Sequence, residues 1–256
     1  MKIVFIGAGN LATRLSQEMH RAGLNVVQVY SRTRESAEAL GRRLGCGWTL
    51  DPDAILPDAD LYVFSLKDAV LPELISRVKP NDALWVHTAG SIPMDIFAGH
   101  VSRYGVLYPL QTFSKQRGTD FSSIPFFLEA TREEDLNILR KIARSLTSDI
   151  RTLSSDKRKS LHLAAVFACN FTNHMYALAA RLLEEQDIPF EVLLPLIDET
   201  AAKVHGLSPR EAQTGPAVRY DENVIGKHLD MLSDTDMKEL YRLLSRNIHK
   251  ETHRDE

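Results

Sequence analysis

The chain opens with a glycine turn whose spacing can hold a phosphate. Gly7, Gly9 and Ala12 form the pattern G-x-G-x-x-A between an apolar run and a stretch with helical spacing. The first glycine permits a tight turn, the second lets the backbone approach a pyrophosphate, and Ala12 lets helix and strand pack closely. Free N–H groups at the start of a helix favour an anion. The turn predicts dinucleotide binding through Gly7, Gly9, Asn10 and Leu11; the alternative is a purely structural turn.

A polar, cationic cluster follows the second apolar run. Ser31, Arg32 and Arg34 stand where NAD-binding domains carry an acid, about 20 residues after the glycines. A hydroxyl and two guanidinium groups can bind a doubly charged 2′-phosphate, which an acid would repel. The cluster therefore predicts NADP rather than NAD as the cofactor. For Arg34, the alternative is that it is only the first residue on the exposed face of the next helix.

Two further stretches follow apolar runs, "FSLKDA" (64–69) and "HTAGS" (87–91). Ligands of open parallel sheets bind beyond the carboxyl ends of the strands. We therefore expect contacts on the nicotinamide side of the cofactor from Ser65, Leu66, Lys67, Thr88, Ala89 and Gly90. Lys67 is equally interpreted as an exposed first-turn residue, and His87, on the strand itself, as a packed core histidine. "YPLQTF" (108–113) follows another strand, and its proline directs the chain across the cleft.

Polar residues interrupt a long apolar helix expected over 155–186. His162 and Asn173 fall on one stripe at helical spacing, and Asn170 lies at an adjacent angle. Such groups must find partners or face a cavity. They either bond between helices or form a polar wall at the nicotinamide, with His162 as a proton donor and Asn170 or Asn173 orienting a carbonyl or imine. Neither the histidine spacing nor neighbouring carboxylates predict a metal site.

The segment 211–229 contains Thr214-Gly215-Pro216, followed by Arg219 and Asp221. Small residues with one arginine suit a turn that closes over an acidic substrate. They also suit an ordinary connection between helices, which is the simpler interpretation.

The elements that must position these residues alternate between strand and helix as far as about residue 154. Short apolar runs predict strands over 2–7, 25–31, 61–66, 83–90, 103–110, 125–130 and 149–154. Helical spacing falls between them, over 10–23, 34–45, 68–78 and 133–146. This alternation predicts a Rossmann-type, mostly parallel sheet with helices on both faces, in a domain of residues 1–153.

From residue 154 onward the pattern is helical, which predicts an all-α domain over 154–256. Its first helix, 155–186, is Ala-rich and apolar around much of its circumference, with Ser155 or Asp156 as the N-cap. Further helices are expected within 189–206 and 235–251. So apolar a helix must be buried, either by a domain partner or by a second subunit.

Composition limits the classes of partner. The 256 residues carry a formal charge of −3, and the pI is near 6.3, so nucleic acid is not expected as a main partner. Two distant cysteines fit a reducing compartment. The apolar run 2–7 is too short for a secretory signal, and no stretch approaches the ~20 apolar residues of a membrane span. We therefore expect a cytoplasmic protein with a small-molecule substrate and no membrane partner.

The motifs "GAGNLA", "YPLQTFS", "HLAAVFACNF" and "TGPAVRYD…HL" together resemble a family of bacterial Rossmann-like NADP oxidoreductases with a C-terminal helical domain. More distantly, the chain is similar to pyrroline-5-carboxylate reductase, prephenate dehydrogenase and the β-hydroxyacid dehydrogenases. The resemblance implies a C-terminal domain like that of 6-phosphogluconate dehydrogenase and a homodimer formed through the C-terminal helices.

One position departs from these relatives. β-Hydroxyacid dehydrogenases carry a catalytic lysine four residues before an asparagine; if Asn170 matches that asparagine, Val166 replaces the lysine. Imine reduction depends less on such a base. The sequence thus leads us to expect an NADP(H)-dependent oxidoreductase acting on a small, acidic carbonyl or imine. The alternatives are an NADP-binding regulatory or sensor dimer without turnover and a reduced-deazaflavin-linked NADP oxidoreductase.

Overall fold

The computed structural model describes residues 1–254 and divides into two compact units, Met1–Asn173 and His174–Glu256. The first unit holds the sheet together with helix α5 (Ser155–Ala165) and the π-helical turn after it (Val166–Phe171). The predicted domain boundary after residue 153 coincides with the change from strands to helices and not with the division between the two compact units. The boundary stays a prediction.

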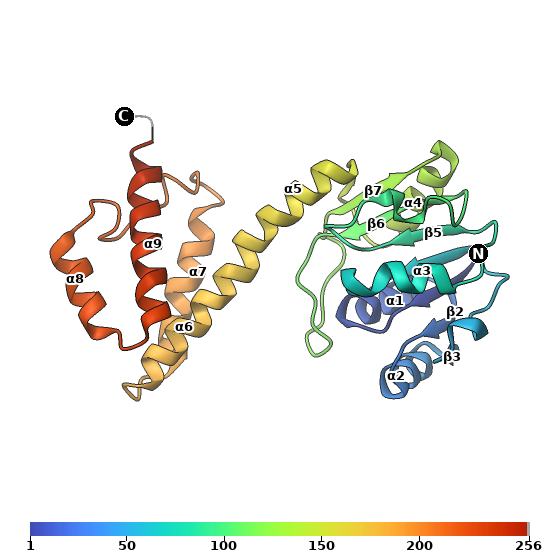
Figure 1. Cartoon of the computed structure of the whole chain (residues 1–256), viewed down its shortest axis with the longest axis horizontal. Helices are drawn as coiled ribbons and strands as arrows, with labels where there is room; N and C mark the ends of the chain where they lie inside the picture. The colour runs from blue at the N-terminus through green and yellow to red at the C-terminus, as the bar shows by residue number, and fades with distance from the viewer. Residues whose placement is uncertain (255–256) are drawn as a thin grey trace. The chain divides into compact units, whose positions relative to one another are not determined.

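The first unit is built on one eight-stranded sheet in the order β3-β2-β1-β4-β5-β6-β7-β8 (Figure 1). The strands are β1 (Lys2–Ile6), β2 (Asn25–Tyr30), β3 (Gly47–Thr49), β4 (Leu61–Phe64), β5 (Leu84–His87), β6 (Tyr104–Pro109), β7 (Phe126–Ala130) and β8 (Ile150–Thr152). Neighbours run parallel except β6 and β7. The mostly parallel, Rossmann-type sheet is thereby confirmed. Strand β3 was not expected, because three edge residues, one exposed and two half-buried, give no periodic signal.

Helices cover both faces of the sheet, as the alternation of elements predicts. On one face lie α1 (Asn10–Arg21), α2 (Arg34–Leu44) and α4 (Glu133–Arg144), and on the other lies α3 (Leu71–Arg77). Leu15 and Leu139 join the first core, while Leu74 and Phe97 join the second. β1 is buried on both sides from Ile3 onward, as its continuous apolar run requires. The carboxyl ends of β1, β4, β5 and β6 therefore meet at one edge of the sheet.

A buried ionic cluster fastens α5 to this sheet. The Arg158 guanidinium, 1% exposed, pairs with the Glu129 carboxylate of β7 and donates to the Ile92 carbonyl. The same carboxylate accepts hydrogen bonds from the backbone N–H and the hydroxyl of Ser155, each at 2.8 Å. A buried charge is tolerated when it is paired and hydrogen-bonded in this way. The cluster thus fixes the first turn of α5, one helical turn before His162.

The long helix is continuous but not uniform. α5 leads through the π-helical turn into α6 (Thr172–Glu184). A π-turn accommodates one residue more than an α-turn and so rotates every later side chain around the helix axis. The expected single stripe from His162 to Asn173 is therefore wrong, because it assumed regular α-helical spacing throughout.

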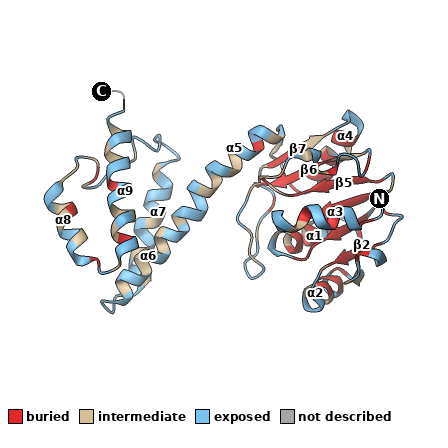
Figure 2. Cartoon of the chain, in the orientation of Figure 1, coloured by how far each residue is buried: buried red, intermediate tan, exposed pale blue. Residues whose placement is uncertain are grey.

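The second unit is helical, as expected, and contains most of α6 with α7 (Leu194–Lys203), α8 (Glu222–Met231) and α9 (Thr235–Thr252). Helix α8 was missed by the sequence analysis, although Asp221 caps it by accepting from the Val224 N–H. The buried side chains described in this unit are Ala217, Ile225, Leu232, Met237 and Ser245, and Figure 2 shows these helices mostly exposed. In residues 1–254 no helix combines the length and apolarity needed to span a membrane.

Candidate functional site

A cavity of about 680 Å³ lies at the carboxyl edge of the sheet. Its walls come from the turn after β1, the ends of β2, β4, β5 and β6, and one residue of α5. These are the strand ends that the sequence analysis selected, and the structure brings them together within the first unit.

The glycine turn at this edge has the geometry of a phosphate cradle. Gly7 has φ 121°, and a Cβ there would lie 2.1 Å from the Ser65 carbonyl oxygen, so only glycine fits. A Cβ on Gly9 would meet nothing within 4 Å, which leaves space in front of α1. The first turn of α1 has no side-chain cap and no acidic residue. Its N–H groups are thus available to an anion, and the turn fits a dinucleotide pyrophosphate.

Asn10 and Leu11 also line the cavity, but Asn10 has a further contact. Its side-chain amide donates to the Phe113 carbonyl at 3.1 Å, which ties the loop between β6 and β7 to the start of α1.

At the end of β2, the structure separates the two arginines of the cationic cluster. Ser31 and Arg32 line the cavity, whereas the Arg34 guanidinium lies 5.4 Å from the ring centroid of Trp48. This position over the indole fits the alternative that Arg34 belongs to the exposed face of α2, and its contact with the cofactor stays a prediction. Thr33 and Ser36 line the cavity instead. Their hydroxyls at the start of α2 were a signal that the sequence analysis overlooked.

The strand ends of β4 and β5 place all six expected residues on the cavity wall: Ser65, Leu66, Lys67, Thr88, Ala89 and Gly90. The Thr88 hydroxyl donates to the Ser65 hydroxyl at 3.1 Å, and both residues are nearly buried. Asp68 also lines the wall and accepts a short hydrogen bond from the Ser91 hydroxyl.

His87 lies behind this wall and is fully buried, which confirms its interpretation as a core histidine. Its Nδ1 accepts from the Ala89 N–H at 3.1 Å, while its Nε2 has no partner. Burial lowers the pKa of His87 to about 3, and the nearby Arg158 charge acts in the same direction. The ring is therefore neutral at physiological pH and supports the backbone of the Thr88–Gly90 turn.

A tyrosine and a histidine meet at the same wall. The Tyr108 hydroxyl lies 3.1 Å from Nδ1 of His162, and both residues line the cavity. Burial raises the pKa of the Tyr108 phenol, so it stays protonated at neutral pH. A Cβ on Gly90 would lie 2.5 Å from Nδ1 of His162, so glycine at that position lets the imidazole approach.

Tyr108 was missed as a site residue, although it stands in a strand-end motif that the sequence analysis had quoted. The other two polar candidates of the long helix lie elsewhere: Asn170 and Asn173 are exposed and do not line this cavity. Asn170 stands in the π-helical turn and Asn173 in α6, so both follow the one residue of the long helix, His162, that lines the cavity.

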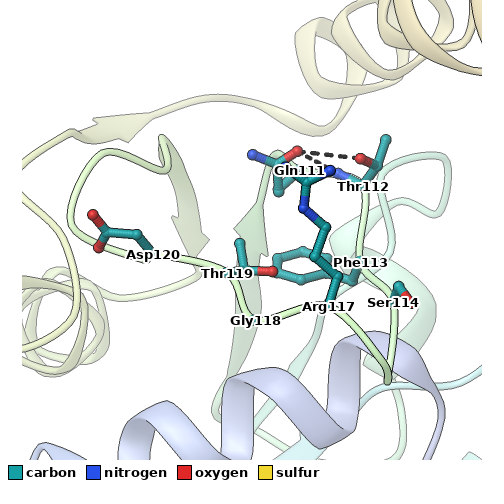
Figure 3. A pocket seen from close by; sticks show the side chains of 8 residues that line it. All are labelled: Gln111, Thr112, Phe113, Ser114, Arg117, Gly118, Thr119 and Asp120. Carbon is teal, nitrogen blue, oxygen red and sulfur yellow. Dashed lines mark hydrogen bonds between the residues drawn. The ribbon is translucent and has the colours of Figure 1, made fainter. Parts of the chain in front are cut away.

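A second cavity, of about 410 Å³, lies along the loop between β6 and β7. Its lining consists of Gln111, Thr112, Phe113, Ser114, Arg117, Gly118, Thr119 and Asp120 (Figure 3). The Gln111 side-chain carbonyl accepts from the Thr112 N–H at 2.8 Å, and Arg117 extends toward it. Gln111 and Phe113 line both cavities, so this loop forms a shared wall. The described residues hold no cluster of three or more histidine, cysteine or carboxylate side chains that could bind a metal ion.

Comparison with known proteins divides the sequence into two family matches. Residues 2–89 match the family described as NADP oxidoreductase, coenzyme F420-dependent. Residues 124–248 match a domain family of unknown function, DUF2520. A candidate NADP oxidoreductase from Bacteroides fragilis is 57% identical and has a crystal structure with a TM-score of 0.95, covering 97% of this chain and 98% of that chain.

More distant proteins share the fold. An imine reductase from Myxococcus stipitatus in complex with NADP+ is 15% identical, with a TM-score of 0.66 over 99% of this chain and 93% of that chain. Pyrroline-5-carboxylate reductase from Staphylococcus epidermidis is 28% identical over 102 residues, which make up 37% of this chain and 38% of that protein. The match thus spans well under half of the curated relative.

Proposed function

The chain belongs to the family of NADP oxidoreductases that join an F420-dependent-type N-terminal domain to a C-terminal DUF2520 domain, and from this we propose that it is an NADP(H)-dependent oxidoreductase acting on a small, acidic carbonyl or imine. The proposal depends on one observation above all: the Tyr108–His162 pair lies on the wall of the cavity that holds the glycine cradle. An acid–base pair beside a dinucleotide site is what hydride transfer to a carbonyl or imine requires.

The residues of this cavity suit NADP. The first-turn N–H groups of α1 would hold the pyrophosphate, while Ser31, Arg32, Thr33 and Ser36 would hold the 2′-phosphate. When bound, NADPH supplies the hydride. The wall formed by Thr88, Ala89 and Gly90 would pack against the nicotinamide side, and His87 keeps that wall in place.

The Tyr108–His162 pair would supply the proton. If the Tyr108 hydroxyl donates to Nδ1, the neutral imidazole carries its proton on Nε2. His162 can then give that proton to the nitrogen or oxygen that gains negative charge while the Tyr108 hydroxyl proton moves to Nδ1, so that the ring stays neutral and the phenolate is reprotonated from solvent. His162 is accordingly the proposed proton donor, and Tyr108 its partner.

An imine is the preferred substrate class. If Asn170 matches the asparagine of the hydroxyacid dehydrogenases, Val166 replaces their catalytic lysine, which disfavours their chemistry here. The names of two similar proteins, an imine reductase and a reductase of pyrroline-5-carboxylate, support an imine, and the second supports a carboxylate on it.

Cofactor binding can be tested first and turnover second. Calorimetric titration with NADPH and NADH should show tight NADPH binding and weaker NADH binding. NADPH oxidation by small cyclic imino acids and keto acids should then be lowered about 100-fold or more in His162→Ala, without loss of NADPH affinity. His100→Ala, an exposed histidine of the same unit, is the matched control. Full turnover in both His162→Ala and Tyr108→Phe would refute the assigned roles.

A second candidate is hydride exchange between NADP and a reduced deazaflavin, which the description of the family matched by residues 2–89 favours. Turnover with a deazaflavin and none with any imine or carbonyl would support it. Tight NADPH binding without turnover in either assay would support the third candidate function, an NADP-binding regulatory or sensor dimer.

We also propose that the second unit forms a homodimer. Its described part buries few side chains, while Leu196 is 62% exposed and Met231 81% exposed. Other exposed apolar residues described in this unit are Leu182, Ile188, Val192, Leu194, Val204, Leu207, Leu243 and Leu244. A unit of this size with so small a core usually needs a partner. Light scattering should report a dimer that Leu196→Glu weakens; a monomeric wild type would refute this proposal.

A cytoplasmic location accompanies these proposals, because Cys46 and Cys169 are free thiols. With a net charge of −3, we propose a small-molecule substrate as the partner rather than nucleic acid or a membrane. Fractionation of cells that express the chain would test the location.

A further inference from the structure

The loop between β6 and β7 is bonded to the helix that begins at the glycine cradle. Asn10 donates to the Phe113 carbonyl at 3.1 Å. Arg14 donates through Nε to the Ser114 carbonyl at 2.8 Å and through a terminal nitrogen to the Lys115 carbonyl at 2.7 Å. Asn10 and Arg14 are one turn apart on α1, so both face the same side of the helix. Three successive carbonyls of the loop are thus held against the first two turns of α1.

This attachment brings one cation of the loop to the cofactor cavity. Gln111, Phe113 and Lys115, at alternate positions, line that cavity, whereas Arg117 lines the second cavity (Figure 3). Lys115 makes no ion pair or side-chain hydrogen bond with another residue in 1–254. Its ammonium group is therefore available to a ligand.

The distribution of charge along the cavity gives this lysine a specific partner. The cradle from Gly7 to Ala12 offers N–H groups but no cationic side chain, although a pyrophosphate carries two negative charges. Arg32 lies at the end of β2, where the 2′-phosphate is expected, and Lys67 follows β4 on the nicotinamide side. Lys115 is the cation whose backbone is bonded to α1 beside the cradle.

We propose that Lys115 is a further cofactor-binding residue, whose ammonium group pairs with the pyrophosphate of the dinucleotide. Asn10 and Arg14 are positioning residues that hold its backbone in place. This inference rests on the proposed function, because it requires a dinucleotide in the cavity. It assigns Asn10 a role in loop attachment in addition to its place in the cradle.

Titration calorimetry on the full chain tests the assignment without reference to activity. Since NADPH and NADH share the pyrophosphate, Lys115→Gln should raise the Kd of both by the same factor, about tenfold. Arg32→Gln should raise the Kd of NADPH and leave that of NADH nearly unchanged. Lys141→Gln, which removes an exposed lysine of α4, should change neither. The salt dependence of binding should also decrease in Lys115→Gln.

The positioning role has its own readout. Arg14→Gln should raise both Kd values in the same direction, and adding it to Lys115→Gln should produce little further change, because the two residues act through one contact. Thermal unfolding of each variant checks that the fold is retained.

Each contrary outcome has a distinct meaning. Unchanged affinities in Lys115→Gln would overturn the inference. A loss confined to NADPH would place Lys115 at the 2′-phosphate and overturn the pyrophosphate assignment. A wild-type chain that binds neither dinucleotide would overturn the proposed function itself, and the inference with it.

Discussion

His87 should make the stability of the protein sensitive to mild acid. The ring is fully buried, and its pKa is lowered from 6.5 to about 3 by burial and by the Arg158 charge. In the unfolded chain His87 takes up a proton near pH 6.5, whereas in the folded protein it does so only near pH 3. The unfolded state therefore binds more protons between these values, so the free energy of unfolding falls as the pH is lowered. The loss approaches about 1.4 kcal/mol per pH unit only below pH 6.5, so it amounts to about 2 kcal/mol between pH 7 and pH 5.

His87→Asn isolates this contribution. The Asn carbonyl can still accept from the Ala89 N–H, but it does not titrate, so the variant should lose about 2 kcal/mol less than the wild type between pH 7 and pH 5. Its stability at pH 7 should be lower, because the ring contact with Phe97, 5.8 Å between centroids, is lost. Urea unfolding followed by circular dichroism at pH 7, 6 and 5 gives both quantities. Arg158 and its partner Glu129 are common to both proteins. An equal pH dependence in the two would refute the reasoning.

Three further substitutions test the site geometry. Gly90→Ala should displace His162 and lower turnover about 100-fold with little loss of NADPH affinity. Steady-state kinetics and calorimetric titration would measure the two effects, and unchanged turnover would contradict the close approach of the His162 ring to Gly90. Gly7→Ala should destabilise the fold by about 3 kcal/mol in urea unfolding, because φ is positive and the Cβ would meet the Ser65 carbonyl; a neutral effect would mean that the turn relaxes. Arg34→Ala should keep the NADPH/NADH preference in calorimetry, since its guanidinium stacks on an indole; loss of that preference would return Arg34 to the cofactor site.

The sequence predicts the strand ends of this fold well because local patterns determine them. Continuous apolar runs mark strands buried on both faces, and the glycine turn marks the entry to α1, so the residues after β1, β4 and β5 could be identified as cavity residues from the chain alone. Parallel packing then brings these ends to one edge, whatever the loops between them do.

What the sequence did not predict depends on partners distant in the chain. Tyr108 meets His162 across 54 positions, and the Arg34 guanidinium lies over the ring of Trp48, on an edge strand of three residues. The π-helical turn, which contains Asn170, arises from a shift in backbone hydrogen bonding that apolar periodicity does not record. The first two features depend on tertiary contacts that a local pattern does not contain, and the third depends on a local change in backbone hydrogen bonding.

The Glu129 cluster limits how this protein can be divided or recombined. Glu129 stands on β7, but the donors that compensate its carboxylate, Ser155 and Arg158, both come from α5. A fragment ending at residue 153 would leave that carboxylate without these partners and would lack His162 altogether. Exchange of C-terminal regions between relatives would therefore have to carry α5 along with the sheet. The evolutionary unit of this fold therefore includes the last strand, β8, and the helix that follows it, α5.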